Sequence, residues 1–143
     1  MAFIDEQEKR IAEILATGAN AGENLRRSPI TTRKYLDYLR QNIDLPCLLT
    51  GREDFLWEEK YVFGFGSEEE YEELKKTNPS YTDTFELLEF MDLKEGDEDI
   101  IVKVKRKSDN KIFFIGLDWL KAKKKNSKNF QRIDDYGVWH TNY

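Results

Sequence analysis

The segment between residues 100 and 115 constrains the fold of this chain more than any other part of the sequence. Three apolar residues occupy alternate positions there: Ile100, Val102 and Val104. Lys103 and Lys105 fall on the opposite side, because successive side chains of a strand point to opposite faces. The tetrapeptide at 108–111, Ser-Asp-Asn-Lys, favours a tight turn. The sequence therefore predicts an antiparallel hairpin of residues 98–107 and 111–116 whose apolar side faces the core.

The apolar side of this hairpin needs a cover, and the last amphipathic segment, Asn129–Tyr143, supplies one. The predicted helices are Asp5–Thr17, Ile30–Asn42 and Asn129–Tyr143, in which apolar residues recur near helical spacing. Ser28-Pro29 marks the start of the second helix, because proline is tolerated in a first helical turn. The apolar stripes of the second and last helices predict four buried residues: Leu36, Leu39, Ile133 and Trp139.

The middle of the chain combines short strands with an acidic helix. The predicted strands are residues 47–50, 55–57, 61–63 and 84–91, which are short runs rich in apolar and aromatic residues. Ser67 and Glu70 have the spacing of a capping box, in which each side chain satisfies a backbone N–H group. A helix is therefore expected over Glu68–Lys76, with Pro79 ending it.

These elements predict a single α+β domain over residues 1–143. It should contain two N-terminal helices, a small antiparallel sheet, one inserted acidic helix and a C-terminal helix. Residues 1–27 are expected to form a loosely attached N-terminal helix and its connection. The chain is 39% hydrophobic and 13% aromatic. That content is sufficient for a core and argues against disorder.

The residue types present argue against several kinds of chemistry. Cys47 is the only cysteine, and its apolar surroundings predict a small buried hydrophobe. His140 is the only histidine and is expected at the surface or at its rim. One cysteine and one histidine cannot form a zinc site, and no nucleophile and base can be paired from them. The sequence therefore predicts a protein that is not an enzyme.

Charge limits the partners. A net charge of −5 argues against nucleic acid, which requires a cationic face. No apolar run is long enough for a membrane span or a secretion signal, so a cytoplasmic location is expected. The charge is unevenly distributed. Residues 68–99 contain 13 acidic residues and three lysines, whereas residues 103–132 contain 11 basic residues and two aspartates.

The acidic stretch Glu95–Asp99, just before the hairpin, permits two interpretations. It is either the solvated end of the hairpin or part of a cation site. Calcium takes six to eight oxygen ligands, and carboxylates and loop carbonyls supply these without cysteine or histidine. The stretch is not an EF-hand loop, because the glycine and the glutamate of that loop are absent from the required positions.

Three segments resemble the small CcbP-type calcium-binding proteins of cyanobacteria. Tyr35–Pro46, YLDYLRQNIDLP, is similar to an aromatic helix followed by the entry to a strand. Met91–Leu117 is similar to an acid-rich loop followed by a hairpin, and NFQRIDDYGVWHTNY resembles that family's closing helix. The resemblance covers under half of the chain. It departs from the family pattern at Arg40-Gln41-Asn42, where acidic residues are usual, and over Glu58–Tyr81, which has no counterpart.

The resemblance implies a compact α+β domain with a small antiparallel barrel-like sheet and a surface calcium site made of carboxylates. Four residues of the acidic loop are then the predicted ligands: Asp92, Asp97, Glu98 and Asp99. Asp134 or Asp135 would complete the coordination sphere if the last helix packs beside the hairpin.

A second interpretation is a protein-interaction or inhibitor-like module. In that case the acidic helix Glu68–Lys76 binds a basic partner, and its glutamates steer the encounter electrostatically. The two interpretations remain open at the level of sequence, as does the oligomeric state.

Overall fold

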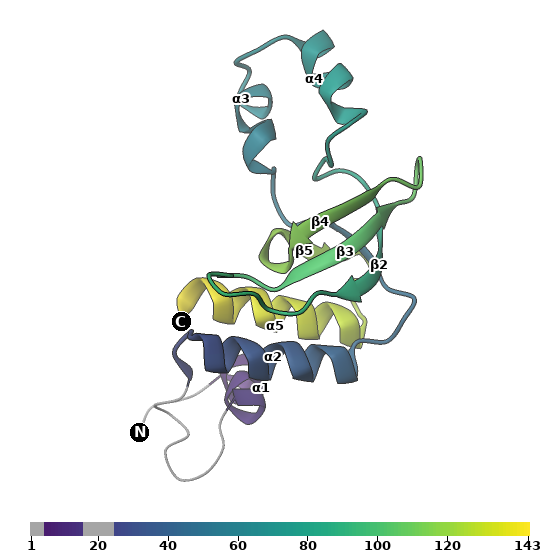
Figure 1. Ribbon diagram of the computed structural model, residues 1–143. Coiled ribbons are helices and arrows are strands. Elements are labelled where there is room, and N and C mark those ends of the chain that lie inside the picture. The colour runs from purple at the N-terminus through teal and green to yellow at the C-terminus, as the bar shows by residue number, and fades with distance from the viewer. Residues whose placement is uncertain (1–4, 16–24) are drawn as a thin grey trace.

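The computed structural model describes residues 5–15 and 25–143 of the chain (Figure 1). The helices are α1 (Glu6–Leu15), α2 (Pro29–Asn42), α3 (Glu59–Val62), α4 (Glu68–Lys75) and α5 (Lys128–Asn142). The strands are β1 (Leu48–Gly51), β2 (Phe85–Phe90), β3 (Ile101–Arg106), β4 (Ile112–Gly116) and β5 (Leu120–Ala122). Short 3-10 turns lie at Leu56–Glu58 and Leu117–Trp119.

The strands form one antiparallel sheet in the order β4-β3-β2-β1-β5. Helices α2 and α5 lie along one side of the sheet, α1 packs beyond them, and α3 and α4 project on the other side (Figure 1). The fold class is therefore α+β, as predicted. The expectation of a barrel-like sheet was wrong, because within the described chain β4 and β5 remain unpaired edges and the sheet stays open.

The predicted hairpin and its register are confirmed. β3 pairs with β4 so that Val102 lies opposite Ile115 and Val104 opposite Phe113. Val102 and Val104 are fully buried, and the apolar alternation therefore faces the core. Asn110 makes the turn with a positive φ of 62°, a conformation that asparagine tolerates better than most residues.

The helices that cover the sheet are held by caps and by an aromatic core. Ser28 caps α2 and Ser127 caps α5 through their side-chain oxygens. All four residues predicted to be buried are at most 1% exposed: Leu36, Leu39, Ile133 and Trp139. The Tyr35 ring joins the two helices, with its centroid 5.0 Å from that of Trp139 and 5.2 Å from that of Tyr136. The part of the predicted first helix beyond Leu15 lies outside the described residues.

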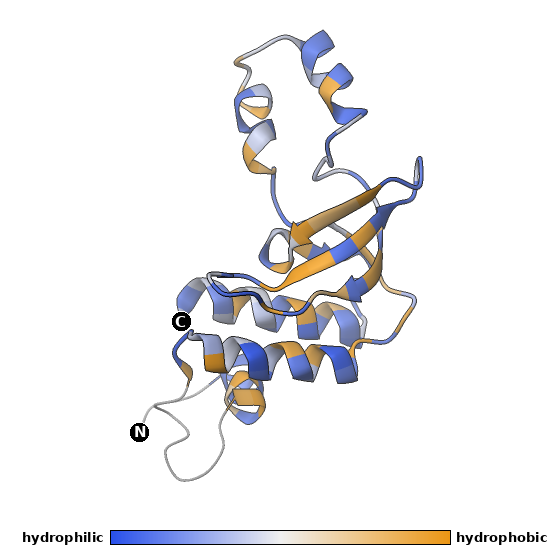
Figure 2. Ribbon diagram, in the orientation of Figure 1, coloured by the Kyte–Doolittle hydropathy of each residue, from blue (hydrophilic) through white to orange (hydrophobic). Residues whose placement is uncertain are grey.

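Residues 52–83, which we call the arm, leave the sheet after β1 and return to it at β2. The prediction of strands at 55–57 and 61–63 was wrong, because both runs are helical. Trp57, Tyr61 and Tyr71 explain the difference. The Tyr61 and Tyr71 rings stack at 4.9 Å and Trp57 packs on Tyr71 at 5.6 Å, so residues four apart share one face. Figure 2 shows α4 as mainly hydrophilic.

None of the helices among the described residues is long and apolar enough to cross a membrane.

Replacing Leu39 by alanine should lower the free energy of unfolding by about 2–5 kcal/mol, because the change leaves a cavity at a fully buried position. Ile30→Ala, in the same helix, is the matched control. Ile30 is 71% exposed, so its truncation should change stability by less than about 0.5 kcal/mol. Urea unfolding curves measure both values. An unchanged midpoint for Leu39→Ala would contradict a core-facing α2.

Candidate functional site

The acidic loop, residues 91–99, joins β2 to β3 and contains a turn closed by two hydrogen bonds between Lys94 and Asp97. The Asp97 carboxylate accepts a hydrogen bond from the Lys94 N–H group at 2.8 Å, and the Asp97 N–H group donates to the Lys94 carbonyl at 3.0 Å. Gly96 turns the chain between them with a φ of 88°. The side chains of Asp97 and Glu98 are exposed. The centre of the loop is therefore a solvated turn with two carboxylates at its surface.

Asp92 lies at the start of the loop and is paired with a cation of the protein itself. Arg40, near the end of α2, donates from Nη2 to Asp92 Oδ1 at 2.7 Å and to the Phe90 carbonyl at 2.8 Å. This hydrogen bond and the charge of Arg40 lower the pKa of Asp92. The Asp92 side chain remains 86% exposed, so solvent still reaches it.

Asp99, at the other end of the loop, points into the protein. Tyr136 of α5 donates its hydroxyl hydrogen to Asp99 Oδ1 at 2.6 Å, and the Asp118 N–H group donates to Oδ2 at 3.2 Å. Burial raises the pKa of Asp99, and the Tyr136 hydrogen bond opposes that rise. A side chain at Gly116 would bring its Cβ to 2.3 Å from Asp99 Oδ2, so this contact requires glycine.

His140 fastens the loop backbone to α5. Its Nε2 atom lies 2.6 Å from the Glu98 carbonyl oxygen and its Nδ1 atom 3.0 Å from Asp118 Oδ2. The side chain is 12% exposed, a partly buried position that agrees with the expected rim location and not with an open surface. Sequence reasoning missed Tyr136 and His140 as loop contacts. Their spacing of four on one helix face was the available signal.

The two adjacent aspartates of α5 do not complete a coordination sphere at the loop. Asp135 is bound by Arg10, whose Nε and Nη2 atoms lie 2.7 and 2.9 Å from its two oxygens. Asp134 accepts hydrogen bonds from Gln7 and Arg52. Among residues 5–15 and 25–143, no three acidic, histidine or cysteine side chains converge where they could hold a metal ion. Side chains alone therefore leave the coordination of a cation at the loop incomplete, and a site there needs loop carbonyls or water as further ligands.

A second acidic surface lies on the arm. Helix α4 begins at the N-cap Ser67, whose hydroxyl oxygen accepts a hydrogen bond from the Glu70 N–H group, which confirms the Ser67 half of the predicted capping box. Its exposed glutamates are Glu68, Glu69, Glu70, Glu72 and Glu73. Glutamates four apart on one helix face repel each other. The helix consequently presents a dense negative surface.

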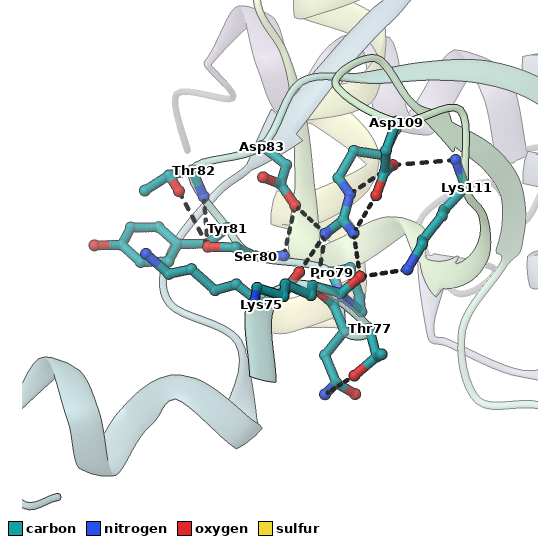
Figure 3. A network of polar contacts seen from close by, with 12 residues as sticks. Lys75, Thr77, Pro79, Ser80, Tyr81, Thr82, Asp83, Asp109 and Lys111 are labelled. Carbon is teal, nitrogen blue, oxygen red and sulfur yellow. Dashed lines mark hydrogen bonds and ion pairs between the residues drawn. The ribbon is translucent and has the colours of Figure 1, made fainter. Parts of the chain in front are cut away.

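Arg106, the last residue of β3, anchors the C-terminal end of α4. Its guanidinium donates to the carbonyls of three residues at or beyond that end: Lys75, Lys76 and Asn78, at 2.9–3.0 Å. It also binds Asp83 at 3.0 Å and both oxygens of Asp109 at 3.0 and 2.8 Å. Figure 3 shows Asp83, Asp109 and Lys111 gathered around this end of the helix. The Arg106 side chain is 4% exposed.

Comparison with protein families finds no match for this chain, and comparison with curated proteins finds none. Two solved structures share the fold. The crystal structure of Anabaena CcbP is 17% identical, with a TM-score of 0.56 over 97% of this chain and 94% of that one. A calcium-binding protein in its calcium-binding form is 18% identical, with a TM-score of 0.57 over 96% of this chain and 91% of that one. The likeness thus spans far more of the chain than the sequence resemblance did, and it concerns the fold.

Acid should weaken the anchor of the arm through Asp109. The hydrogen bond from Arg106 lowers the pKa of Asp109 from 3.8 to about 2. Between these values the unfolded chain binds more protons than the folded protein, so stability is present above pH 3.8 and is lost as the pH falls through about 2. Asp109→Asn should remove this part of the acid dependence, as measured by urea unfolding at a series of pH values.

Arg106→Gln is the paired variant. It removes the guanidinium that lowers the pKa of Asp109, so it should lose the same part of the dependence of the free energy of unfolding on pH. The double variant should show a pH dependence no weaker than that of either single variant. A slope for Asp109→Asn parallel to that of the wild type would contradict the assignment.

Proposed function

We propose that this protein is a non-enzymatic calcium-binding protein of low affinity whose cation is held by the acidic loop. The observation that carries the proposal is the exposure of three loop carboxylates on a fold shared with CcbP and with a calcium-binding protein: Asp92, Asp97 and Glu98. These are the hard oxygen ligands that calcium prefers. In this proposal Asp99, which Tyr136 binds from inside, positions the loop.

The geometry of the loop supports a weak site. The carboxylates of Asp92 and Asp97 already have partners in Arg40 and the Lys94 N–H group, and a cation has to compete with both. Calcium accepts flexible coordination and fills incomplete spheres with water and loop carbonyls. The expected dissociation constant therefore lies at the weak end of the biological range, about 10⁻⁴–10⁻³ M.

The non-enzymatic part of the proposal rests on the surroundings of the one cysteine and the one histidine of the chain, residue types that serve as nucleophile and base in many enzymes. Cys47 is 3% exposed, and burial raises the pKa of its thiol to about 11, which keeps the reactive thiolate scarce. His140 is engaged by the Glu98 carbonyl and by Asp118. Both side chains hold structure in this arrangement.

Calcium should raise the melting temperature of the wild type. At a free concentration about tenfold above the dissociation constant, binding should add about 1.4 kcal/mol to stability, which corresponds to a rise of about 3–6 °C. Asp97→Asn combined with Glu98→Gln should abolish this rise and the heat of calcium titration. Asp99 is left intact, because its contacts with Tyr136 and Asp118 hold the loop.

The matched control is Glu72→Gln combined with Glu73→Gln on α4. It removes the same two negative charges from another exposed surface, so a calcium effect that belongs to the loop should survive it. If the control loses the effect equally, calcium is acting through net charge alone. A wild type that gives neither heat nor a thermal shift at millimolar calcium would show that the chain shares the fold without the binding.

We also propose a second function, protein interaction through the arm. The observation that favours it is the exposure of large apolar side chains beside the α4 glutamates: Phe63 is 70% and Phe65 72% exposed. Apolar groups bordered by charge mark interaction surfaces. The partner that fits is a basic surface with an apolar centre.

A peptide of alternating lysine and leucine residues serves as a probe of this surface. It should shift the amide resonances of the arm in ¹H–¹⁵N spectra, and the shifts should weaken as salt screens the glutamates. Phe63→Ser combined with Phe65→Ser leaves the charge unchanged and should reduce binding. Equal shifts in that variant would mean that the peptide reads charge alone, which would contradict a docking surface.

A further inference from the structure

Lysines from the basic second half of the chain surround an apolar pocket of about 500 Å³. Its walls are formed by Pro46, Cys47, Leu48 and Ala122, and its rim carries Lys107, Lys123 and Lys124. We call it the lysine-rimmed pocket. Its volume is within the range of about 300–1,000 Å³ that is typical of binding sites.

The electrostatics of this pocket favour a negatively charged occupant. Glu86 is the one acidic residue that lines it, and Lys107 is 3.8 Å from that carboxylate. Lys123 donates to the Thr84 hydroxyl at 2.7 Å, while Lys124 is exposed. Ser127, the N-cap of α5, also lines the pocket, and the positive end of that helix dipole adds to the field of the lysines. An apolar group flanked by carboxylates matches both the walls and the rim.

The arm carries a segment with this chemistry. The exposed apolar residues of this segment lie within four positions of one another: Val62, Phe63 and Phe65 are 43%, 70% and 72% exposed. Gly64 and Gly66 adopt φ values of 87° and 126°, which turn the chain and leave both phenylalanines at the surface. Glu68 and Glu69 follow immediately. We call residues 62–69 the arm tip.

We propose that the arm tip of one copy of this chain docks in the lysine-rimmed pocket of a second copy. The inference rests on the proposed interaction function of the arm and names its partner. The two surfaces are complementary in polarity and in charge: exposed phenylalanines face apolar walls, and glutamates face lysines. Because the two surfaces differ, the contact is head to tail, and it extends into a ring or a chain of copies. The arm projects clear of the sheet and helices, which leaves its tip accessible (Figure 1).

Two variants separate the surfaces. Phe63→Ser combined with Phe65→Ser disables the arm tip and keeps the pocket, whereas Lys123→Glu combined with Lys124→Glu disables the pocket and keeps the arm tip. All four positions are exposed, so the fold should persist, and thermal melting checks this. Sedimentation velocity from about 10 µM to about 1 mM covers the range of weak association.

The wild type should gain mass with concentration, and high salt should reverse the gain because it screens the rim. Each variant alone should remain a monomer. An equimolar mixture should form a one-to-one dimer that grows no further, because only one complementary pair of surfaces remains. A wild type that stays monomeric, or a mixture that stays monomeric, overturns the inference. If the lysine–leucine peptide still binds the arm in that case, the interaction function stands and only the identity of the partner fails.

Discussion

One buried guanidinium determines where the arm lies. Arg106 ends β3 and satisfies carbonyl groups at the end of α4 that the helix itself cannot pair. Its charge is balanced by Asp83 and Asp109. Removing one partner of a buried ion pair leaves an uncompensated charge and typically costs about 3–5 kcal/mol. The position of the acidic helix therefore depends on this residue more than on the helix sequence itself.

The opposite end of β3 has the same role for the acidic loop. Asp99 and Ile100 precede the strand, and both bind the Tyr136 hydroxyl, which donates to the Asp99 carboxylate and accepts from the Ile100 N–H group at 3.0 Å. Between the two ends run the buried valines that hold the sheet to α2 and α5. A single strand thus positions both acidic surfaces, one through a carboxylate and the other through a guanidinium. Substitutions that disturb its register would displace the loop and the arm together.

The sequence predicted those elements whose periodicity is long enough to be unambiguous. The hairpin, α2 and α5 each repeat their pattern several times, and all three were confirmed. The runs at 55–57 and 61–63 are three residues each, too short to separate a strand from a helical turn. The four candidate ligands were found as a cluster in sequence, but the inward turn of Asp99 depends on Tyr136, which is 37 residues away. The spacing of Tyr136 and His140 places them on one helix face, but no local pattern identifies the loop as their partner, and none identifies the pairing of Arg40 with Asp92.

That pairing bears directly on how this chain handles its negative charge. Arg40 stands near the end of α2, and its guanidinium binds the loop carboxylate and carbonyl that a cation would approach. Two other aspartates are also paired with arginines: Asp135 with Arg10, and Asp109 with Arg106. An arginine brings one charge and several directed hydrogen bonds, whereas calcium brings two charges and draws in six or more oxygens. The loop carboxylates are therefore already satisfied in part by the protein itself. At the proposed site a calcium ion would gain only the difference between its own coordination and the contacts that it displaces, and this difference, more than the number of carboxylates, would set the affinity.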